Sequence, residues 1–413
     1  MTPEIKHRIG QIRRGEMPEG YNRVRDSIIP SDWKQYCLGE LGKNKNGLNF
    51  HREDKGIKIR ILGVGDFGNL SVLRDLNALS EISMRFMPDD ELLLKNGDIV
   101  FVRSNGSKEL VGRNLLVYPQ NEKVSFSGFC IRFRLSSDKI TTAEYINLVL
   151  DNGVLKQKLQ SENQGSNISN LNQSIIDNLQ ISIPCKGEQQ KIAAILATQD
   201  KVIELKEKRL AEKQRQKKYL MQQLLTGKKR LPGFIGKWKT FGFNEIFITI
   251  STKGLQINKA EYETKGRYPV IDQGRQMIAG YSNKAEKALM CPKEGVIVFG
   301  DHTREIKFVN FDFIVGADGT QLLSAKSKNA AIKYLFYYLS NKDIHSDGYS
   351  RHFKYVKEFA YRLPPLGEQT AIAEVLSTAD REIELLQQDI EQEKQKKKAL
   401  MQLLLAGIVR VKT

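Results

Sequence analysis

The sequence predicts a mixed α/β (α+β) protein: two globular regions separated by two long antiparallel coiled-coil helices, related by a pseudo-twofold internal duplication. The first observation is a repeat, since residues 181–231 align without a gap on residues 361–411 and 21 of the 51 pairs are identical. The second is a heptad spacing of apolar residues inside each copy. Because this period far exceeds the roughly 20 to 50 residues of a solenoid unit, each copy is expected to be a globular region followed by the shared segment.

The shared segment is predicted to form one long helix in each copy. Apolar residues advance by threes and fours through residues 192–224 and again through residues 372–404, as they do along the seam of a coiled coil. No proline interrupts residues 187–226, and Gly227 and Gly407 stand where a helix would end. A helix of about 40 residues spans roughly 60 Å.

Each long helix has two candidate partners. It could pack on its own globular region, but the lysine-rich stretch 206–218 is too polar to be covered by a domain surface. An antiparallel partner helix needs only a narrow apolar stripe. The antiparallel pair is therefore the favoured arrangement.

The two globular regions share a coarse order of elements. Each begins with a tryptophan, Trp33 or Trp238, and each closes with an apolar-periodic helix, expected at 141–150 and at 330–339. Short β-type runs lie between, and we expect curved antiparallel sheets. These runs are 57–63, 97–112, 125–135, 267–274, 294–309 and 312–323. The predicted divisions are 1–30 (N-terminal helix and lead-in), 31–186 (first globular region), 187–231 (first long helix), 232–366 (second globular region) and 367–413 (second long helix).

The net charge of +17 is unevenly placed. Residues 187–231 hold 12 Lys and Arg against 5 Asp and Glu, and residues 232–366 hold 20 against 13. Such an excess favours a polyanionic partner, most often nucleic acid. The first globular region is nearly balanced, so a nucleic-acid surface there would need segregated charge.

Other classes of protein find little support. No run approaches 18 apolar residues and the N-terminus has no hydrophobic signal core, so we expect a cytoplasmic protein with no membrane partner. The four cysteines lie far apart without a CxxC pair, and the five histidines have no metal-ligand spacing. Neither a disulfide framework nor a metal site is predicted.

At this point the residues carry a family resemblance. The segment PPLGEQ, a long helix ending in LMQxLLxG and a globular region that begins with a tryptophan resemble the DNA-specificity (S) subunit of type I restriction-modification enzymes. The segments RRGEMPEGYNRVRDSIIPSDW, GDIVFVRSNGSKELVGR and YPVIDQGRQMIAGY add to it, and it covers essentially the whole chain. Cys185-Lys186 departs from the pattern of Pro365-Leu366, which puts the start of that helix in question.

The resemblance implies a fold and a set of partners. The globular regions would be target-recognition domains that each read half of a bipartite site in double-stranded DNA, and the helices would set the gap. Two modification subunits and two restriction subunits would complete the enzyme. They, and not this chain, would hold S-adenosylmethionine, ATP and Mg. The N-terminal residues 9–21 resemble the end of each long helix and suggest a short helix that completes the pseudo-twofold arrangement.

Candidate DNA contacts lie in polar loops that follow β-type runs. Arg and Asn can match guanine and adenine edges in the major groove. The alternative for each residue is an ordinary polar turn whose arginine bonds a backbone carbonyl or a carboxylate. The candidates are Arg103, Ser104, Asn105, Ser107, Lys108 and Arg113 in the first region, and Arg275, Gln276, His302, Thr303 and Arg304 in the second.

Two alternative functions stay open. The sequence GVGDFG at residues 63–68 follows a β-type run and spells GxGxxG, a signature of dinucleotide or methyl-donor binding. That site would require a helix beginning at Gly68, and no βα alternation follows. An autonomous DNA adenine methyltransferase that uses this segment is one alternative, and a duplicated DNA-binding regulator is the other. The favoured prediction is a DNA-recognition subunit without catalytic, cofactor-binding or metal-binding residues of its own.

Overall fold

The computed structural model describes residues 2–24, 27–50, 56–68, 70–104, 110–153, 158, 171–317, 319–326, 330–346 and 351–411. The chain divides into two compact units. Unit 1 comprises Met1–Leu205 and Ile390–Thr413, and unit 2 comprises Lys206–Asp389. Each unit therefore contains one globular region and one half of each long helix.

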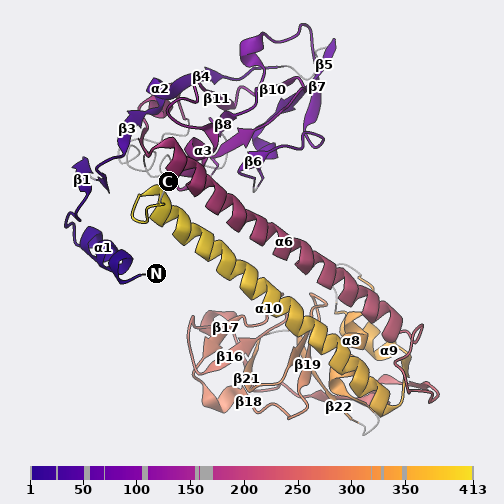
Figure 1. The fold of residues 1–413 in the computed structure, drawn as a ribbon. Helices are drawn as coiled ribbons and strands as arrows, with labels where there is room; N and C mark the ends of the chain where they lie inside the picture. The colour runs from indigo at the N-terminus through magenta and orange to yellow at the C-terminus, as the bar shows by residue number, and fades with distance from the viewer. Residues whose placement is uncertain are drawn as a thin grey trace. The chain divides into compact units, whose positions relative to one another are not determined.

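Unit 1 is built on a five-stranded sheet in the order β4-β11-β8-β9-β6, with a three-stranded sheet β10-β5-β7 against it (Figure 1). Its elements are α1 (Pro3–Arg13), β1 (Tyr21–Val24), β2 (Ser27–Pro30), β3 (Lys34–Cys37), α2 (Leu38–Leu41), β4 (Gly42–Asn46), β5 (Ile57–Leu62), β6 (Val72–Leu73), β7 (Ser80–Met84), β8 (Asp98–Val102), β9 (Asn114–Val117), β10 (Val124–Phe126), β11 (Cys130–Leu135), α3 (Ala143–Asp151), α5 (Gln173–Asp177) and β12 (Gln180–Ile183).

The alternation of side chains along β8 separates two cores. Ile99 and Phe101 face the cluster that contains Tyr145 of α3, whereas Val100 and Val102 face the cluster under the three-stranded sheet. Because successive side chains of a strand point to opposite faces, a strand that is apolar at every position is buried on both sides. All five residues of β8 are buried.

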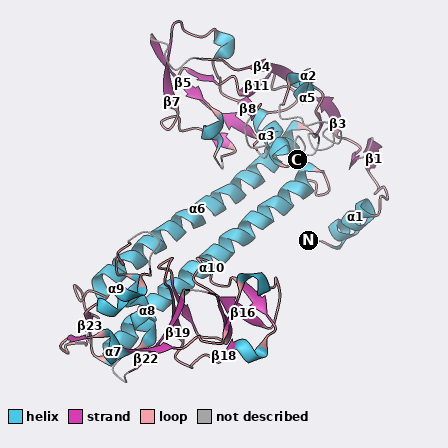
Figure 2. Cartoon of the chain, turned by 180° about the vertical axis from the view of Figure 1, so that it is seen from behind, coloured by secondary structure: helices cyan, strands magenta, loops and turns pink. Residues whose placement is uncertain are grey.

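Unit 2 repeats this plan with a four-stranded sheet β14-β22-β19-β20 and a second sheet β15-β21-β16-β17, to which β18 adds (Figure 2). Ile297 and Phe299 of β19 face α8, and Val296 and Val298 face the second sheet. The elements are β13 (Lys239–Phe241), α7 (Phe243–Ile246), β14 (Phe247–Ile250), β15 (Gln256–Ile257), β16 (Tyr268–Ile271), β17 (Gly280–Ser282), β18 (Ala288–Leu289), β19 (Val296–Gly300), β20 (Ile306–Val309), β21 (Phe313–Gly316), β22 (Thr320–Ala325), α8 (Ile332–Ser340), α9 (Phe353–Glu358) and β23 (Tyr361–Leu363).

The expectation of antiparallel sheets holds for most of the described strand pairs but not for all of them. In unit 1, β5 pairs with β10 and β6 pairs with β9 in parallel. In unit 2, β21 pairs in parallel with both β15 and β16. Parallel pairing arises because the chain leaves one strand and passes through several other elements before it returns to the same sheet.

The two long helices are α6 (Lys186–Leu224) and α10 (Leu366–Leu405), of 39 and 40 residues, and this confirms the prediction from the heptads. Both begin at the same repeat position. The amide of Glu188 donates to the carbonyl of Cys185 at 3.0 Å, and the amide of Glu368 donates to that of Pro365 at 3.0 Å. The change to Cys185-Lys186 therefore does not alter where the helix starts.

Within each unit the segments of α6 and α10 run antiparallel. In unit 1 the Gln199 amide donates to the Glu393 carboxylate at 2.6 Å, and Lys397 pairs with Asp200 at 2.6 Å. In unit 2 the partner number falls as the residue number rises, as it must between antiparallel segments. The ion pairs there are Lys206–Asp389 at 2.8 Å, Lys213–Glu382 at 2.7 Å and Lys217–Asp380.

The helix ends also pack into the globular cores, so the two arrangements weighed for the helices coexist. Ile192 and Leu196 of α6 join Met401 and Leu404 of α10 in the core of unit 1. In unit 2, Leu224 of α6 and Leu225 just beyond its end join Ile372 and Leu376 of α10. Helix α1 confirms the predicted N-terminal helix.

Candidate nucleic-acid interface

Three loops meet at one rim of the globular region in unit 1. They are the segment after β5 (63–68), the residues Arg103 and Ser104 that follow β8, and the turn between β10 and β11 (127–129). The Ser127 amide donates to the carbonyl of Leu62 at 2.9 Å. The Arg103 amide donates to the carbonyl of Phe129 at 2.8 Å. We call this set of three loops the unit 1 rim.

Unit 2 has an equivalent rim, formed by residues 272–276 after β16, residues 301–305 between β19 and β20, and Gly319 directly before β22. The Asp301 amide donates to the carbonyl of Gly319 at 2.7 Å, as Arg103 does to Phe129. The Gln273 side chain accepts from the His302 amide at 3.2 Å, and its carbonyl accepts from the Thr303 hydroxyl. Gln273 thus joins two of the three loops.

The predicted residues of unit 1 are only partly described. Arg103 is half-buried and its guanidinium lies 3.5 Å from the carbonyl of Gly128. Ser104 and Arg113 are also half-buried, and the Ser104 amide approaches the carbonyl of Phe129 at 3.4 Å. Asn105, Ser107 and Lys108 lie outside the described residues. Arg103, Ser104 and Arg113 therefore lie close together at the adjoining ends of β8 and β9, where the Val102 amide donates to the carbonyl of Arg113 at 2.9 Å.

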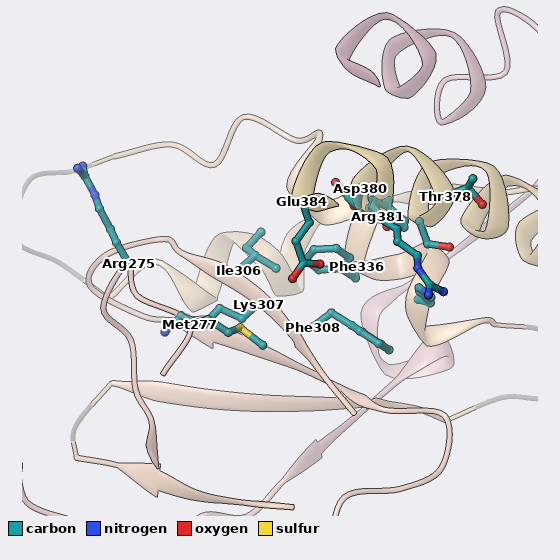
Figure 3. Close-up of a pocket in the computed structure, with 13 residues that line it drawn as sticks. Arg275, Met277, Ile306, Lys307, Phe308, Phe336, Thr378, Asp380, Arg381 and Glu384 are labelled. Atoms are coloured by element: carbon teal, nitrogen blue, oxygen red, sulfur yellow. Dashed lines mark hydrogen bonds between the residues drawn. The ribbon is translucent and has the colours of Figure 1, made fainter. Parts of the chain in front are cut away.

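Arg275 is one of the exposed predicted residues in unit 2. Its side chain is 92% exposed and lies 3.4 Å from the carboxylate of Glu305. Gln276 beside it is also exposed. Figure 3 shows the Arg275 side chain extending away from those of Met277 and Phe308. A guanidinium held this way can approach a large anionic partner without losing buried contacts.

A buried lysine holds the loop that carries Arg275. The Lys307 ammonium donates to the carbonyls of Asp272 at 2.8 Å and of Gln276 at 2.5 Å, and it lies 3.9 Å from the Asp272 carboxylate. Its side chain is 7% exposed, and burial lowers the pKa of its ammonium group. Because a buried cation must be paired or hydrogen-bonded, the position of Lys307 restrains both ends of loop 272–276.

Arg304 makes a hydrogen bond within unit 2. Its backbone has a φ of 63°, in the left-handed region that costs a residue other than glycine about 1 kcal/mol or more. Its guanidinium donates to the carbonyl of Ile344 at 2.9 Å. This contact is the polar-turn alternative that the sequence left open. His302 and Thr303 likewise form hydrogen bonds with Gln273. Residues 301–304 are therefore held by contacts on two sides.

Sequence reasoning missed two residues of the rims, Phe129 and Gln273, and Lys307 of β20, which contacts the unit 2 rim. Phe129 is 61% exposed at the tip of the β10–β11 turn. A phenylalanine directly after a glycine in a predicted turn is the one sequence signal that could have marked it. Gln273 and Lys307 contact residues that lie about 30 positions away along the chain. No local sequence pattern predicts such contacts.

A groove of about 900 Å³ lies beside the unit 2 rim (Figure 3). Apolar side chains line much of it, and its charged residues are of both signs. A smaller pocket of about 420 Å³ shares Arg275 and includes Arg304 and Asp343. The groove is lined by Arg275, Met277, Ile306, Lys307, Phe308, Lys333, Phe336, Tyr337, Ser377, Thr378, Asp380, Arg381 and Glu384.

The GVGDFG segment forms part of the unit 1 rim rather than the start of a long helix. Val64–Phe67 is a single 3-10 turn, and the Asp66 carboxylate accepts from the Gly63 amide at 2.7 Å. In the described part of the chain, no group of three His, Cys, Asp or Glu could hold a metal ion. None of the described helices is long and apolar enough to cross a membrane.

Comparisons with known proteins agree with this arrangement. Residues 30–214 and 235–395 match the family described as Type I restriction modification DNA specificity domain. A Methanocaldococcus jannaschii chain that carries the name MjaX type I restriction enzyme specificity subunit is 26% identical over 424 residues, which cover 96% of this chain and 98% of that one.

Two solved structures share the fold. The S subunit of a type I restriction-modification system from M. genitalium gives a TM-score of 0.58 at 14% identity and covers 94% of this chain and 97% of its own. A chain from a structural study of complex assembly and conformational transition of the type I R-M system gives a TM-score of 0.58 at 16% identity, with coverage of 92% and 99%.

Proposed function

Because the chain belongs to the family of DNA-specificity subunits of type I restriction-modification systems, we propose that each globular region reads one half of a bipartite site in double-stranded DNA through its three-loop rim. The observation that carries this proposal is the recurrence of the rim. Two domains with little sequence identity place polar loops at the same ends of equivalent strands. Recognition of two different half-sites needs one scaffold with different loops.

The rim chemistry suits the major groove of DNA. Arg275 presents an exposed guanidinium, and a forked donor of this kind matches the two acceptors on the guanine edge. Arg103 offers the same group in unit 1. The lysines of α6 and α10 that pair with acidic residues, such as Lys213 with Glu382, are less suited to base contacts. At most they would touch phosphates, which position the protein without specifying sequence.

We further propose that the lengths of α6 and α10 set the gap between the half-sites. Each helix runs unbroken through about 40 residues, or roughly 60 Å. Antiparallel ion pairs occur in both units, so the two helices can act together as a ruler.

Catalysis in this proposal is supplied by partners. Two modification subunits would bind S-adenosylmethionine, and two restriction subunits would bind ATP and Mg. The family names and the study of type I complex assembly support a multi-subunit enzyme. The position of GVGDFG in the unit 1 rim, as one 3-10 turn, favours DNA recognition over methyl-donor binding for that segment.

The test is a comparison of half-site preferences in the assembled methyltransferase. DNA sites are selected from a random pool by the wild-type complex, by Arg103→Ala and by Arg275→Ala. Each variant should relax base preference in one half-site only, and the two should act on opposite halves. Loss of one good base contact costs about 1 to 3 kcal/mol, or roughly 5- to 150-fold in discrimination.

Arg85→Ala and Arg267→Ala are matched controls. Both arginines are exposed and lie at the far ends of β7–β5 and β16 from the rims. They should leave both half-sites unchanged. Equal weakening on all sequences by Arg103→Ala and Arg275→Ala would show that these residues contact phosphate or serve structure, and the rim proposal would then be wrong.

A further inference from the structure

An aromatic side chain stands in solvent at the centre of the unit 1 rim. Phe129 is 61% exposed, and its carbonyl accepts hydrogen bonds from the amides of Arg103 at 2.8 Å and Ser104 at 3.4 Å. The ring therefore emerges from the same few residues that carry the predicted base-reading arginine. Whatever approaches Arg103 from outside also meets Phe129.

The turn that presents this ring is tightly held. The Gly128 amide donates to the carbonyl of Leu48 at 2.6 Å, and the Cys130 amide donates to the carbonyl of Ser127 at 2.8 Å. A Cβ added at Gly128 would lie 2.0 Å from the side-chain oxygen of Asn49. The backbone around Phe129 is thus fixed on both sides, although the ring itself is not packed.

The equivalent position of the unit 2 rim has no side chain. Gly319 accepts from the Asp301 amide as Phe129 does from Arg103. A Cβ at Gly319 would lie 2.8 Å from the His302 ring and 2.9 Å from the Gln273 side chain. The two rims share a backbone arrangement but differ in this one apolar group. A role for the ring should consequently be confined to one half of the DNA site.

We propose that Phe129 contacts the C5 methyl group of a thymine in the half-site read by unit 1, and so is a specificity-determining residue. The inference rests on the proposed function of the rim. Arginine reads hydrogen-bonding edges, whereas the thymine methyl is the one apolar group that base pairs present in the major groove. An exposed ring on a fixed turn next to Arg103 can reach that group without any rearrangement of the turn.

The test removes only the methyl group. The target site is first selected with the assembled methyltransferase. Each thymine of the two half-sites is then replaced singly by deoxyuridine, and binding is measured for the wild type, Phe129→Ala and Phe129→Leu. The wild type should lose roughly 3- to 10-fold affinity at one thymine of the unit 1 half-site. Phe129→Ala should bind thymine and deoxyuridine equally there, and Phe129→Leu should keep part of the difference.

The outcomes separate this inference from the proposed function. The thymine contact is wrong if no deoxyuridine in that half-site weakens wild-type binding, or if the loss persists in Phe129→Ala. Weaker assembly with modification subunits, with unchanged DNA discrimination, would instead make the ring a protein contact and would also overturn it. Arg103→Ala, measured in parallel, reports on the rim. If it still acts on one half-site while deoxyuridine has no effect, only the thymine contact fails.

Discussion

Arg410 donates two hydrogen bonds of 2.9 Å to Glu188, one to each carboxylate oxygen. The repeat places the same pair in unit 2, where Arg230 bonds both oxygens of Glu368. Each arginine lies just beyond the end of one long helix, and each glutamate lies in the first turn of the other. In each unit, the segment that follows one long helix is therefore hydrogen-bonded to the first turn of the other long helix.

The burial of the glutamates explains why this pair recurs. The Glu188 side chain is 1% exposed and that of Glu368 is fully buried. A buried carboxylate without a partner is costly, and two parallel N–H donors from one guanidinium satisfy both of its oxygens. Hydrogen bonds to Glu188 and Asp32 raise the pKa of Arg410 further above its ordinary value.

Arg410→Ala should destabilise unit 1. Because it leaves the Glu188 carboxylate buried and short of donors, and because Arg410 is itself partly exposed, we expect a loss of about 1 to 3 kcal/mol. Unfolding in urea is followed by the fluorescence of Trp33 in a Trp238→Phe background, since the chain has two tryptophans. The double variant Arg410→Ala with Glu188→Gln should be less destabilised than Arg410→Ala alone. A single variant with an unchanged midpoint would contradict this account.

Asp151 should make the stability of unit 1 depend on pH. Burial raises the pKa of its carboxyl to about 6, although the Asn114 amide donates to it at 2.7 Å. Between the unfolded pKa near 4 and the folded pKa, the folded state holds a proton that the unfolded state has released. The contribution of Asp151 to the free energy of unfolding is thus fully present below pH 4 and is lost as the pH rises through 6.

Asp151→Asn should therefore stabilise unit 1 at pH 7.5, by on the order of 1 to 3 kcal/mol. The gain over the wild type should shrink as the pH falls to 4. Urea midpoints of both proteins between pH 4 and 8 measure the difference, and other titrating groups cancel in the comparison. A gain independent of pH would point to packing rather than to the charge.

Lys307→Met should relax recognition in one half-site by loosening loop 272–276. The substitution removes the hydrogen bonds to Asp272 and Gln276, and Arg275 would then lose its fixed position. We expect roughly 5- to 20-fold weaker discrimination in the unit 2 half-site, corresponding to about 1 to 2 kcal/mol. Arg275→Ala should add little in this background, because coupled residues are non-additive.

Lys326→Met is the matched control for Lys307→Met. The Lys326 ammonium also donates to a backbone carbonyl, that of Asn244 at 2.8 Å, but it is exposed and lies away from the unit 2 rim. It should leave the selected sites unchanged. Additive effects of Lys307→Met and Arg275→Ala would show that the lysine does not act through the loop.

Lengthening both long helices should widen the gap between half-sites. Four residues inserted after Leu210 and four after Ile390 add about 6 Å and rotate one end by roughly 40°. The preferred gap should grow by one or two base pairs, at 3.4 Å each, while both half-site sequences stay the same. Site selection from a random pool measures this. A changed half-site with the original gap would mean that these helices do not set the spacing.

The sequence by itself determined the parts of this protein that repeat with a short period. Heptads along α6 and α10, apolar runs such as β8 and β19, and the helices α3 and α8 were predicted because each depends on neighbours within a few residues. The 180-residue duplication, although its period is long, also exposed the two-unit plan. It is visible by aligning the chain with itself.

Tertiary structure alone decided which polar residues can meet a partner. Arg304 and Arg275 look alike in sequence and both are exposed, yet Arg304 bonds the carbonyl of Ile344 whereas the 92% exposed Arg275 lies beside the Glu305 carboxylate. Lys307 is buried and holds a loop, and the Phe129 ring is exposed. Both follow from contacts between strands that lie far apart along the chain. Those contacts, like the parallel pairing of β5 with β10, depend on how strands are ordered in the sheets. That order follows from packing of the whole domain, which no local spacing records.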